Sequence, residues 1–418
     1  MATAPGSQPY DIVVVGARVA GAATAMLLAR AGHRVALVDR VKFPSDTLST
    51  HLLQPAAHLL LHRWGLLDQV VASGAPATTV LQNAVDGWEF ALPFPDPASG
   101  VAALHHPRRT VLDPILVGAA EAAGADVLDR MTVTSVRRAP TGRVVGIDGW
   151  TQDGQPVHVP ATFVVGADGW RSRVARSVGA AAYDERGVVN STHYAYWEGL
   201  DDRGLEVACS TDGLMAGVIP TNGGACVYVN CHPDRVAALR ADPRAGYLAY
   251  LAEVAPELAA RLATARRTSP VRGTPGIPNF KRRPWGPGWV LVGDAGYTKD
   301  PVSGHGITDA FVAAELAAAA IHRALAGAPE PDVFAEYHAR RDELAADLYE
   351  VALAWGSYAW TAEELLGIQA RFAACLTSEA QAVAAFEPWI PVPADAPEPD
   401  APAGERDDPA RTPGSAVA

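Results

Sequence analysis

Apolar and polar positions along the first 180 residues follow the pattern of alternating strands and helices. Residues 11–15 are a short apolar run of β type, and a glycine-bearing turn separates them from an Ala/Leu-rich helical segment that ends at Arg30. A second apolar run, 34–38, is closed by Asp39. This order predicts a βαβ unit, whose parallel strands require a right-handed crossover. The pattern further predicts helices at 54–67 and 110–123, and strands at 126–128, 133–136 and 161–165.

From about residue 190 the pattern becomes that of antiparallel strands. Residues 193–198 alternate, and the runs 214–220 and 225–230 flank Thr221-Asn-Gly-Gly224, which is a strong hairpin signal. The α/β pattern returns at Trp289, and the pattern of apolar positions in residues 330–380 predicts helices.

We therefore expect an α/β protein with a discontinuous Rossmann-like domain, an inserted antiparallel β-sheet domain and C-terminal helices. The predicted bounds are 10–80, 101–185 and 281–328 for the first domain, 81–100 and 186–280 for the second, 329–390 for the helices, and 391–418 for a tail. This tail has six acidic residues against Arg406 and Arg411, seven prolines and no aromatic residue, so we expect it to be disordered.

Composition excludes several classes of protein. A content of 49% apolar and 19% charged residues is that of a globular protein. The net charge of −12 argues against a sequence-independent nucleic-acid binder, which needs a basic face. No membrane span is expected, because the best candidate, 311–321, is short and interrupted by Glu315.

The cysteines and the N-terminus indicate the cytoplasm. The N-terminus has no basic region followed by an apolar core, so no secretory signal is expected. The four cysteines show no CxxC spacing, and His, Cys and Asp show no metal-ligand spacing. We expect free, mostly buried thiols and no resident metal.

The turn after the first strand has the spacing of a dinucleotide-binding loop, Gly16-Ala-Arg-Val-Ala-Gly21. In such loops the first glycine makes the turn, the third lets helix and strand pack, and an acid about 20 residues on, here Asp39, binds a ribose hydroxyl. Arg18 replaces the middle glycine. It either turns outward or covers the phosphates, and an ordinary βαβ turn is the alternative. Arg40 either reaches a phosphate or is solvated.

Three further motifs combine a charged residue with an element end. Arg109 opens a predicted helix, where it either meets a phosphate or lies on the surface. Asp168 ends a predicted strand and precedes Gly169, where its carboxylate either contacts a ligand or caps the next helix. Asp294 begins the stretch GDAGYTKDPVSGHGITDA between a strand and a helix. An acid there can meet a sugar hydroxyl, and the helix N-terminus offers unpaired N–H groups and partial positive charge.

The four motifs, in this order, resemble the FAD-dependent monooxygenases of the p-hydroxybenzoate hydroxylase type. That group A superfamily also contains geranylgeranyl reductases and flavin-dependent halogenases. The resemblance covers residues 10–325 through its motifs and implies an FAD domain with a substrate-binding sheet over the flavin. The departures are Arg18 for glycine and His305, where glutamine is frequent.

The resemblance also implies cofactor contacts for individual residues. These are Gly16, Ala17, Arg18, Ala20 and Gly21 at the pyrophosphate, Asp39 at the adenosine ribose with Arg40 nearby, Arg109 at the ribityl and phosphate region, Val133 at the adenine, Asp168 toward FAD and NAD(P)H, Asp294 at the ribityl chain, and Pro301, Gly304, His305, Gly306 and Ile307 along the isoalloxazine.

Substrate contacts are expected from the predicted sheet. On a strand, Tyr194 and Tyr196 share one side while Trp197 faces the other, and the aliphatic stretch near Met215 adds apolar surface. We expect these four residues to contact substrate, with packing in the sheet core as the alternative. An apolar, aromatic-lined pocket suits a phenol, indole or polycyclic molecule.

Two histidines are candidates for a general base. They are His51, which follows the second strand, and His305, beside the presumed flavin. Histidine titrates near neutrality and can take a phenolic proton. Each can equally be structural.

The resemblance implies a monooxygenase that uses FAD, O2 and a transiently bound NAD(P)H. It would hydroxylate or epoxidise an apolar or aromatic small molecule of secondary metabolism through a C4a-hydroperoxyflavin. One alternative is a flavin reductase or dehydrogenase acting on an alkene, since the 296–301 segment is not confined to hydroxylases. Halogenation is less favoured, because the Trp-x-Trp-x-Ile-Pro signature is absent and lysine is scarce. A non-catalytic FAD-binding protein is the last alternative, and the intact Asp39, Asp168 and Asp294 argue against it.

Overall fold

Five parallel strands form the central sheet of the chain. The computed structural model describes residues 2–3 and 8–390, so the predicted tail at 391–418 lies outside the described residues. The sheet order is β20-β21-β11-β2-β3-β8, with only β20 antiparallel to its neighbour. Its strands are β2 (Tyr10–Val15), β3 (Val35–Val38), β8 (Asp126–Leu128), β11 (Pro156–Gly166), β20 (Trp285–Gly286) and β21 (Trp289–Leu291).

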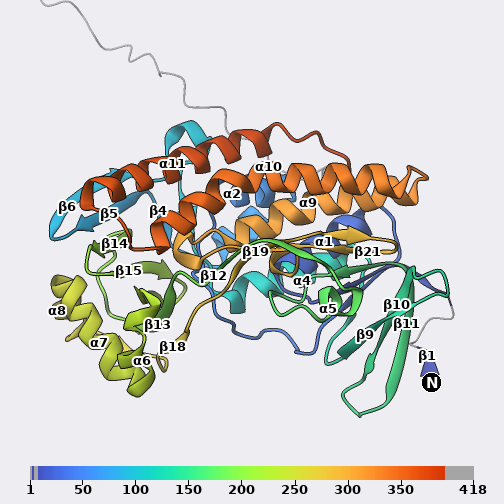
Figure 1. The fold of residues 1–418 in the computed structure, drawn as a ribbon, viewed down its shortest axis with the longest axis horizontal. Helices are drawn as coiled ribbons and strands as arrows, with labels where there is room; N and C mark the ends of the chain where they lie inside the picture. Colours follow the sequence, from blue (N-terminus) through green and yellow to red (C-terminus); the bar gives the residue numbers. More distant parts are fainter. Residues whose placement is uncertain (1, 4–7, 391–418) are drawn as a thin grey trace, which may run out of the picture.

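The strand predicted at 161–165 is longer than expected because its first half has other partners. There β11 pairs with β10 (Val144–Trp150), which pairs with β9 (Thr132–Arg138). The short β1 (Ala2–Thr3) also joins β11. The antiparallel strands β9 and β10, with the first half of β11, form the lobe at the right of Figure 1.

Three helices pack together beside the central sheet: α1 (Val19–Arg30), α4 (Arg109–Ala122) and α9 (Gly306–Leu325). All residues of α1 except the last are buried, because it contacts the sheet and both other helices. The helix predicted at 54–67 is interrupted. α2 (Pro55–Arg63) ends before Gly65, whose φ of 69° does not continue a helix, and α3 (Leu67–Ala72) follows.

A second sheet occupies the other lobe. Its strands are β5 (Val80–Val85), β6 (Trp88–Pro93), β13 (Ser191–Glu198), β14 (Leu205–Ser210), β15 (Leu214–Thr221), β16 (Gly224–Cys231), β17 (Arg266–Arg267) and β18 (Arg272–Thr274). All pairings are antiparallel except β14 with β5. The predicted hairpin is confirmed as β15–β16, closed at Thr221 and Gly224.

Helices cover both faces of this second sheet. One face is packed against α7 (Pro243–Val254) and α8 (Pro256–Leu262), preceded by α6 (Ala237–Ala241), which the sequence pattern did not reveal. The other faces the long C-terminal helices α10 (Glu330–Gly356) and α11 (Ala362–Ala384). Figure 1 shows that α10 and α11 run across the top of both lobes. They therefore connect the two sheets.

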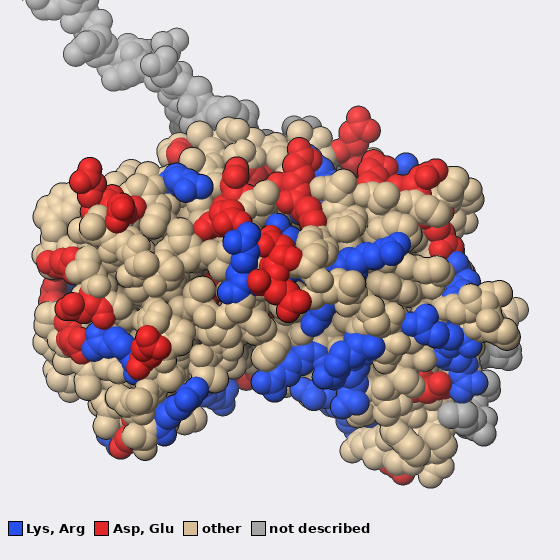
Figure 2. Space-filling view, viewed as in Figure 1, with Lys and Arg blue, Asp and Glu red and all other residues tan. Residues whose placement is uncertain are grey.

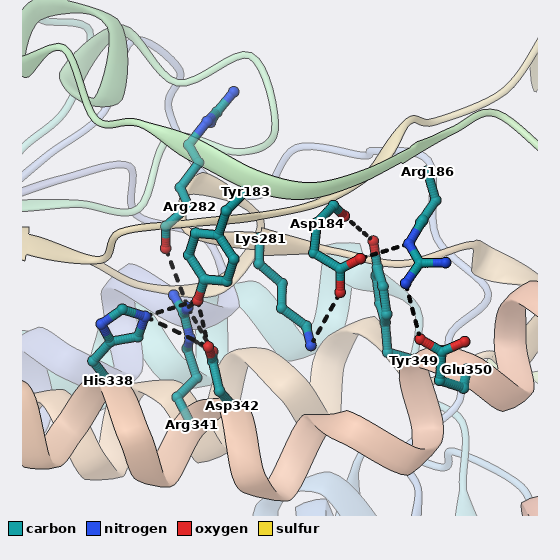
Figure 3. A network of polar contacts seen from close by, with 10 residues as sticks. All are labelled: Tyr183, Asp184, Arg186, Lys281, Arg282, His338, Arg341, Asp342, Tyr349 and Glu350. Atoms are coloured by element: carbon teal, nitrogen blue, oxygen red, sulfur yellow. Dashed lines mark hydrogen bonds and ion pairs between the residues drawn. The ribbon is translucent and has the colours of Figure 1, made fainter.

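A third small sheet joins α10 to the core. It consists of β12 (Ala182–Gly187), β19 (Asn279–Arg282) and β22 (Tyr297–Thr298). The Tyr183 hydroxyl donates to Asp342 and accepts from Arg341, and the Tyr349 hydroxyl donates to the Asp184 carbonyl at 2.8 Å (Figure 3). This polar network fixes α10 to the small sheet.

The remaining elements are short: β4 (Ala77–Thr78), β7 (Leu104–His105) and α5 (Arg173–Val178), and the 3-10 turns η1 (Pro97–Ser99), η2 (Pro233–Arg235), η3 (Gly293–Ala295) and η4 (Pro301–Ser303). All four cysteines are free thiols, and three of them are buried. Within 2–3 and 8–390, no helix combines the length and apolarity that a membrane crossing requires.

Candidate functional site

The four sequence motifs meet at one edge of the central sheet. β2, β3, β11 and β21 are parallel and adjacent, so their carboxyl ends lie side by side. The Gly16 turn follows β2, Asp39 follows β3, Asp168 follows β11, and Asp294 follows β21. In open α/β sheets ligands bind outside the carboxyl ends of the strands. Gly16 and Asp294, which are 278 positions apart in the sequence, thus lie at the same edge of the sheet.

The glycine turn is too tight for larger residues. Gly16 has a φ of 102°, and a Cβ there would lie 2.4 Å from the Ala167 carbonyl oxygen. A Cβ on Gly21 would lie 1.7 Å from the Gly16 oxygen. The Asp39 carboxylate closes the turn by accepting the Ala17 N–H at 2.7 Å. The first and third glycines therefore have the roles that a dinucleotide loop requires.

Arg18 reaches across the turn to α4. Its guanidinium forms an ion pair with Asp113 at 2.7 Å and donates to the Ser45 hydroxyl at 2.9 Å. Arg109 forms an ion pair with the same carboxylate at 2.7 Å. Asp113 is fully buried and was not singled out by sequence analysis, although its i,i+4 spacing from Arg109 is a helix ion-pair signal. Two guanidinium groups therefore share one carboxylate beside the N-terminus of α1.

The other residues that were expected to contact the cofactor lie in different environments. Asp168 accepts hydrogen bonds from the Ser172 hydroxyl and the Arg173 N–H, so its carboxylate caps α5. Val133 is buried on β9, and Arg40 is exposed. Asp168 thus has the structural role that was its alternative interpretation, and any ligand contact would be additional.

The face of the molecule in Figure 2 is hollowed between the two lobes, and Lys and Arg side chains gather along the hollow. Arg171, Arg173 and Arg176 are exposed on and just before α5. Local positive charge here contrasts with the net charge of −12. It suits an anionic ligand.

Asp294 and Gly306 border open space. Asp294 is solvent-accessible, yet the surrounding protein raises the pKa of its carboxyl to about 6, first by desolvation and then through the Asp309 carboxylate. This combination describes an acid in a recess. Gly306 begins α9 and is exposed, and a Cβ there would meet no atom of the described chain within 4 Å. The N-terminus of a 20-residue helix therefore faces free space next to Asp294.

His305 points away from that space. Its imidazole is fully buried, with Nε2 at 2.7 Å from Glu379 Oε2 and Nδ1 at 3.1 Å from Asp309 Oδ1. Both ring nitrogens are therefore engaged in the interior. The structure does not bring this histidine to the open face, where a general base would act.

His51 does reach the second sheet. It is buried, has a φ of 60°, and its Nε2 lies 2.6 Å from the Tyr196 hydroxyl. The ring of Tyr196 also lies under the Arg108 guanidinium, 3.5 Å from its centroid, and next to Tyr194, with ring centroids 5.5 Å apart. Apolar residues surround the two tyrosines, namely Leu52, Leu81, Phe94, Leu205, Ile219, Cys226 and Tyr228.

The other two predicted substrate residues lie elsewhere. Trp197 faces α7 on the opposite side of the sheet, and its Nε1 donates to the Tyr247 hydroxyl at 3.1 Å. Met215 packs against Leu348 and Trp355 of α10. Only Tyr194 and Tyr196 are brought together with His51.

Folding also assembles a possible metal-ligand set that sequence spacing did not reveal. His305, Asp309 and Glu379 offer ligand atoms within 4.8 Å of one another. However, the Lys299 ammonium forms an ion pair with Asp309 and lies 3.0 Å from His305 Nδ1. A cation is thus already supplied by the chain.

The neutral state of His51 predicts a measurable pH dependence. Burial, then Arg109 and Arg108, lowers the pKa of His51 to about 3 from 6.5. As pH falls below 6.5 the unfolded chain binds this proton and the native chain does not, so the residue destabilises the fold. We expect the unfolding free energy of wild type, relative to His51→Gln, to fall by about 1.4 kcal/mol per pH unit between pH 6.5 and 3. Above 6.5 the difference should be flat. Denaturant titrations at a series of pH values test this, and a difference independent of pH would contradict it.

Comparison with known proteins agrees with this geometry. The chain is 29% identical over 332 residues to the menaquinone reductase of Mycolicibacterium smegmatis, covering 74% of this chain and 75% of that protein. It is 27% identical to squalene monooxygenase SE1 of Panax ginseng, covering 72% and 56%.

Solved flavoproteins share the fold. The myxobacterial chondrochloren halogenase CndH superposes with a TM-score of 0.77 at 24% identity, covering 90% of this chain and 97% of that one. PqsL of Pseudomonas aeruginosa, a probable FAD-dependent monooxygenase, gives a TM-score of 0.75 at 20% identity, covering 87% of this chain and 100% of that one.

Fold and site together define an FAD-dependent oxidoreductase. The family model for an FAD binding domain matches residues 9–352, and the chain belongs to that family. The predicted α/β fold and the resemblance to the group A flavoprotein superfamily are confirmed.

Proposed function

We propose that the protein is a monooxygenase that uses FAD, NAD(P)H and O2 to oxygenate an apolar or aromatic small molecule. One observation carries this proposal. The apolar face around Tyr194 and Tyr196 contacts His51, which belongs to the segment after β3 at the cofactor edge. Substrate on that face would therefore lie next to the cofactor.

The charges at the sheet edge support a placement for FAD. The pyrophosphate would bind at the N-terminus of α1, beside Arg18 and Arg109. Asp39 would meet the adenosine ribose and Asp294 the ribityl chain, with the flavin along the segment from Pro301 to Ile307. When bound, FAD would supply the redox chemistry, because a flavin can take two electrons from a nicotinamide and pass them to O2.

The protein's own groups would orient substrate and exclude water. The neutral His51 imidazole accepts or donates a hydrogen bond at the Tyr196 hydroxyl, and burial holds the pKa of that phenol well above its usual range. Tyr196 therefore stays protonated at neutral pH. His51 is as fully buried as His305, and burial lowers its pKa to about 3, so its ring would act as a neutral hydrogen-bonding partner of Tyr196 and not as a strong proton acceptor.

A reductase is the second candidate. The menaquinone reductase relative matches about three quarters of both chains. Such an enzyme would pass two electrons to a polyprenyl or other alkene without consuming O2. The same apolar face would bind that substrate.

Product mass decides between the two. The FAD-loaded protein would be screened for NADH and NADPH oxidation with phenols, indoles, polycyclic molecules and isoprenoid quinones. Ligand-stimulated O2 consumption with a mass gain of one oxygen atom supports the monooxygenase. Anaerobic turnover with a gain of two hydrogen atoms supports the reductase. A protein that cannot be loaded with FAD rules out both.

Tyr196→Phe is expected to slow product formation by about tenfold while leaving FAD affinity unchanged. The substitution removes one buried hydrogen bond, worth about 1 to 2 kcal/mol, and keeps the ring. Steady-state kinetics and FAD titration measure the two effects. Tyr250→Phe is the matched control, because Tyr250 lies on the far side of the same sheet, on α7. Equal losses in both variants would remove Tyr196 from the proposed site.

A further inference from the structure

Four ionisable side chains form a buried cluster behind the first turn of α9. This buried quartet consists of Lys299, His305, Asp309 and Glu379. The exposed fractions are 8% for Lys299, 0% for His305 and 6% for Glu379. Asp309 lies between Lys299 and His305, and Glu379 reaches His305 from α11. The quartet thus links the loop before η4, α9 and the C-terminal helix.

The contacts of the His305 imidazole allow two protonation states of the ring. His305 Nε2 faces one carboxylate and Nδ1 faces another, and a carboxylate accepts but does not donate. An imidazolium donates to both carboxylates at once. A neutral ring protonated at Nε2 would instead donate to Glu379 and accept from the Lys299 ammonium, which lies 3.0 Å from Nδ1. The ammonium also donates to Asp309, so both states satisfy its contacts and the charge balance distinguishes them.

The charge count favours the imidazolium. With His305 protonated, two cations balance two carboxylates. With a neutral imidazole, one buried negative charge is left uncompensated, which is costly away from water. Desolvation and the Lys299 ammonium lower the pKa of His305, but the Glu379 and Asp309 carboxylates outweigh them, so the pKa is raised overall.

Few other charged groups face the quartet. Asp294 of η3 interacts with Asp309, and Tyr297 of β22 and Arg341 of α10 line a cavity of about 20 Å³ that Asp309 and Glu379 also line. The Tyr297 phenol is neutral, since burial holds its pKa well above the usual range. The Arg341 guanidinium is paired with the Asp342 carboxylate at 2.7 Å. The protonation state of His305 therefore sets the net charge behind the N-terminus of α9.

We propose that Glu379 and Asp309 hold His305 as an imidazolium, which keeps the quartet neutral and so favours the negative charge that the flavin gains on reduction. This inference rests on the proposed placement of the flavin along Pro301–Ile307. His305 acts through the electrostatic field behind α9 and is a positioning residue, because its ring does not touch the open face. Charge near the flavin is one of the main ways in which a protein tunes this cofactor.

The test compares His305→Gln with the double variant His305→Gln/Glu379→Gln. His305→Gln leaves Lys299 against two carboxylates and should lower the midpoint potential of bound FAD. We expect the equilibrium constant for two-electron reduction to fall at least tenfold, which is about 30 mV. The double variant removes the excess negative charge and should recover most of that loss. Glu363→Gln, an exposed acid on the same helix, should leave the potential unchanged.

A second measurement does not need FAD. The imidazole nitrogens of His305, assigned by their loss in His305→Gln, should show the chemical shifts of imidazolium at pH 7 in the apoprotein. Neutral-imidazole shifts would overturn the proposal, even if His305→Gln folds poorly.

The remaining outcomes separate this inference from the proposed function. If all variants bind FAD normally with equal potentials, the role of His305 is refuted and the FAD placement loses only this support. If the double variant shows no recovery, the hydrogen bonds rather than the charge matter, and the proposal fails. A stoichiometric metal ion bound by His305, Asp309 and Glu379, removable by chelator, would also overturn it. Failure of wild type to bind FAD refutes the proposed function itself.

Discussion

Asp113→Asn is expected to destabilise the FAD-free protein by about 3 kcal/mol, because a buried charge lost from a paired set leaves its partners uncompensated. Asp113 is fully buried and is held by both Arg18 and Arg109. Asparagine keeps the shape but removes the charge, so two guanidinium groups would face each other. The Arg18 side chain is 27% exposed, so water offsets part of the cost and the value lies at the low end for a buried pair.

FAD should recover part of this loss. In the proposed placement its pyrophosphate lies beside the same two arginines and replaces the missing negative charge. We therefore expect FAD to raise the melting temperature of Asp113→Asn more than that of wild type. Thermal unfolding with and without FAD measures both effects.

Asp129→Asn is the matched control, since Asp129 forms an ion pair with Arg130 at the surface. Exposed pairs of this kind contribute about 0 to 1 kcal/mol. If Asp113→Asn destabilises the protein no more than the control does, Asp113 does not hold Arg18 and Arg109 in the two ion pairs described above. An equal FAD effect on variant and wild type would place the pyrophosphate elsewhere.

Asp294→Ala is expected to lower FAD affinity by about tenfold to a hundredfold. A charged hydrogen bond is worth about 1.5 to 3 kcal/mol, and the proposed contact with the ribityl chain is of this kind. The loop that carries Asp294 is tightly held, because a Cβ on the preceding Gly293 would lie 2.9 Å from Ala20 on α1. Another side chain cannot readily move into its place.

The loss of affinity should occur without loss of stability. Desolvation and Asp309 already disfavour the Asp294 carboxylate, and its raised pKa means that ionisation opposes folding at neutral pH. Removal of the charge is therefore expected to leave the FAD-free protein as stable as wild type or slightly more so. Titration of the apoprotein with FAD, together with thermal unfolding, separates these quantities. Asp153→Ala, in an exposed turn, is the control. Unchanged FAD affinity would refute the placement of Asp294.

Local patterns predicted the elements that depend on neighbouring residues. The βαβ unit and the hairpin at Thr221–Gly224 form as predicted, because strand periodicity and turn glycines act over a few residues. The second half of β11 was predicted and the first half was not, since its partner β10 was not recognised as a strand. Helices α6–α8 were missed as well.

The candidate site was predicted in its positions but not in its contacts. Motif spacing placed Gly16, Asp39 and Asp294 at strand ends, and parallel pairing brings those ends together. The partners of Arg18 could not be read from its motif, because Asp113 lies 95 residues away. His305 looked like a residue beside the flavin, yet Glu379, 74 residues further on, holds its ring in the interior.

By itself the sequence determined the fold class, the FAD-binding family and the strand-end positions of the motifs, because short-range periodicity and glycine geometry specify them. Only the tertiary structure decided which way the side chains at those positions turn. Tyr196 meets His51 while Trp197, its neighbour, packs under α7, since the two faces of the strand are covered by different elements. The buried quartet exists only because α11 returns to α9, and its charge balance depends on groups that no local motif contains.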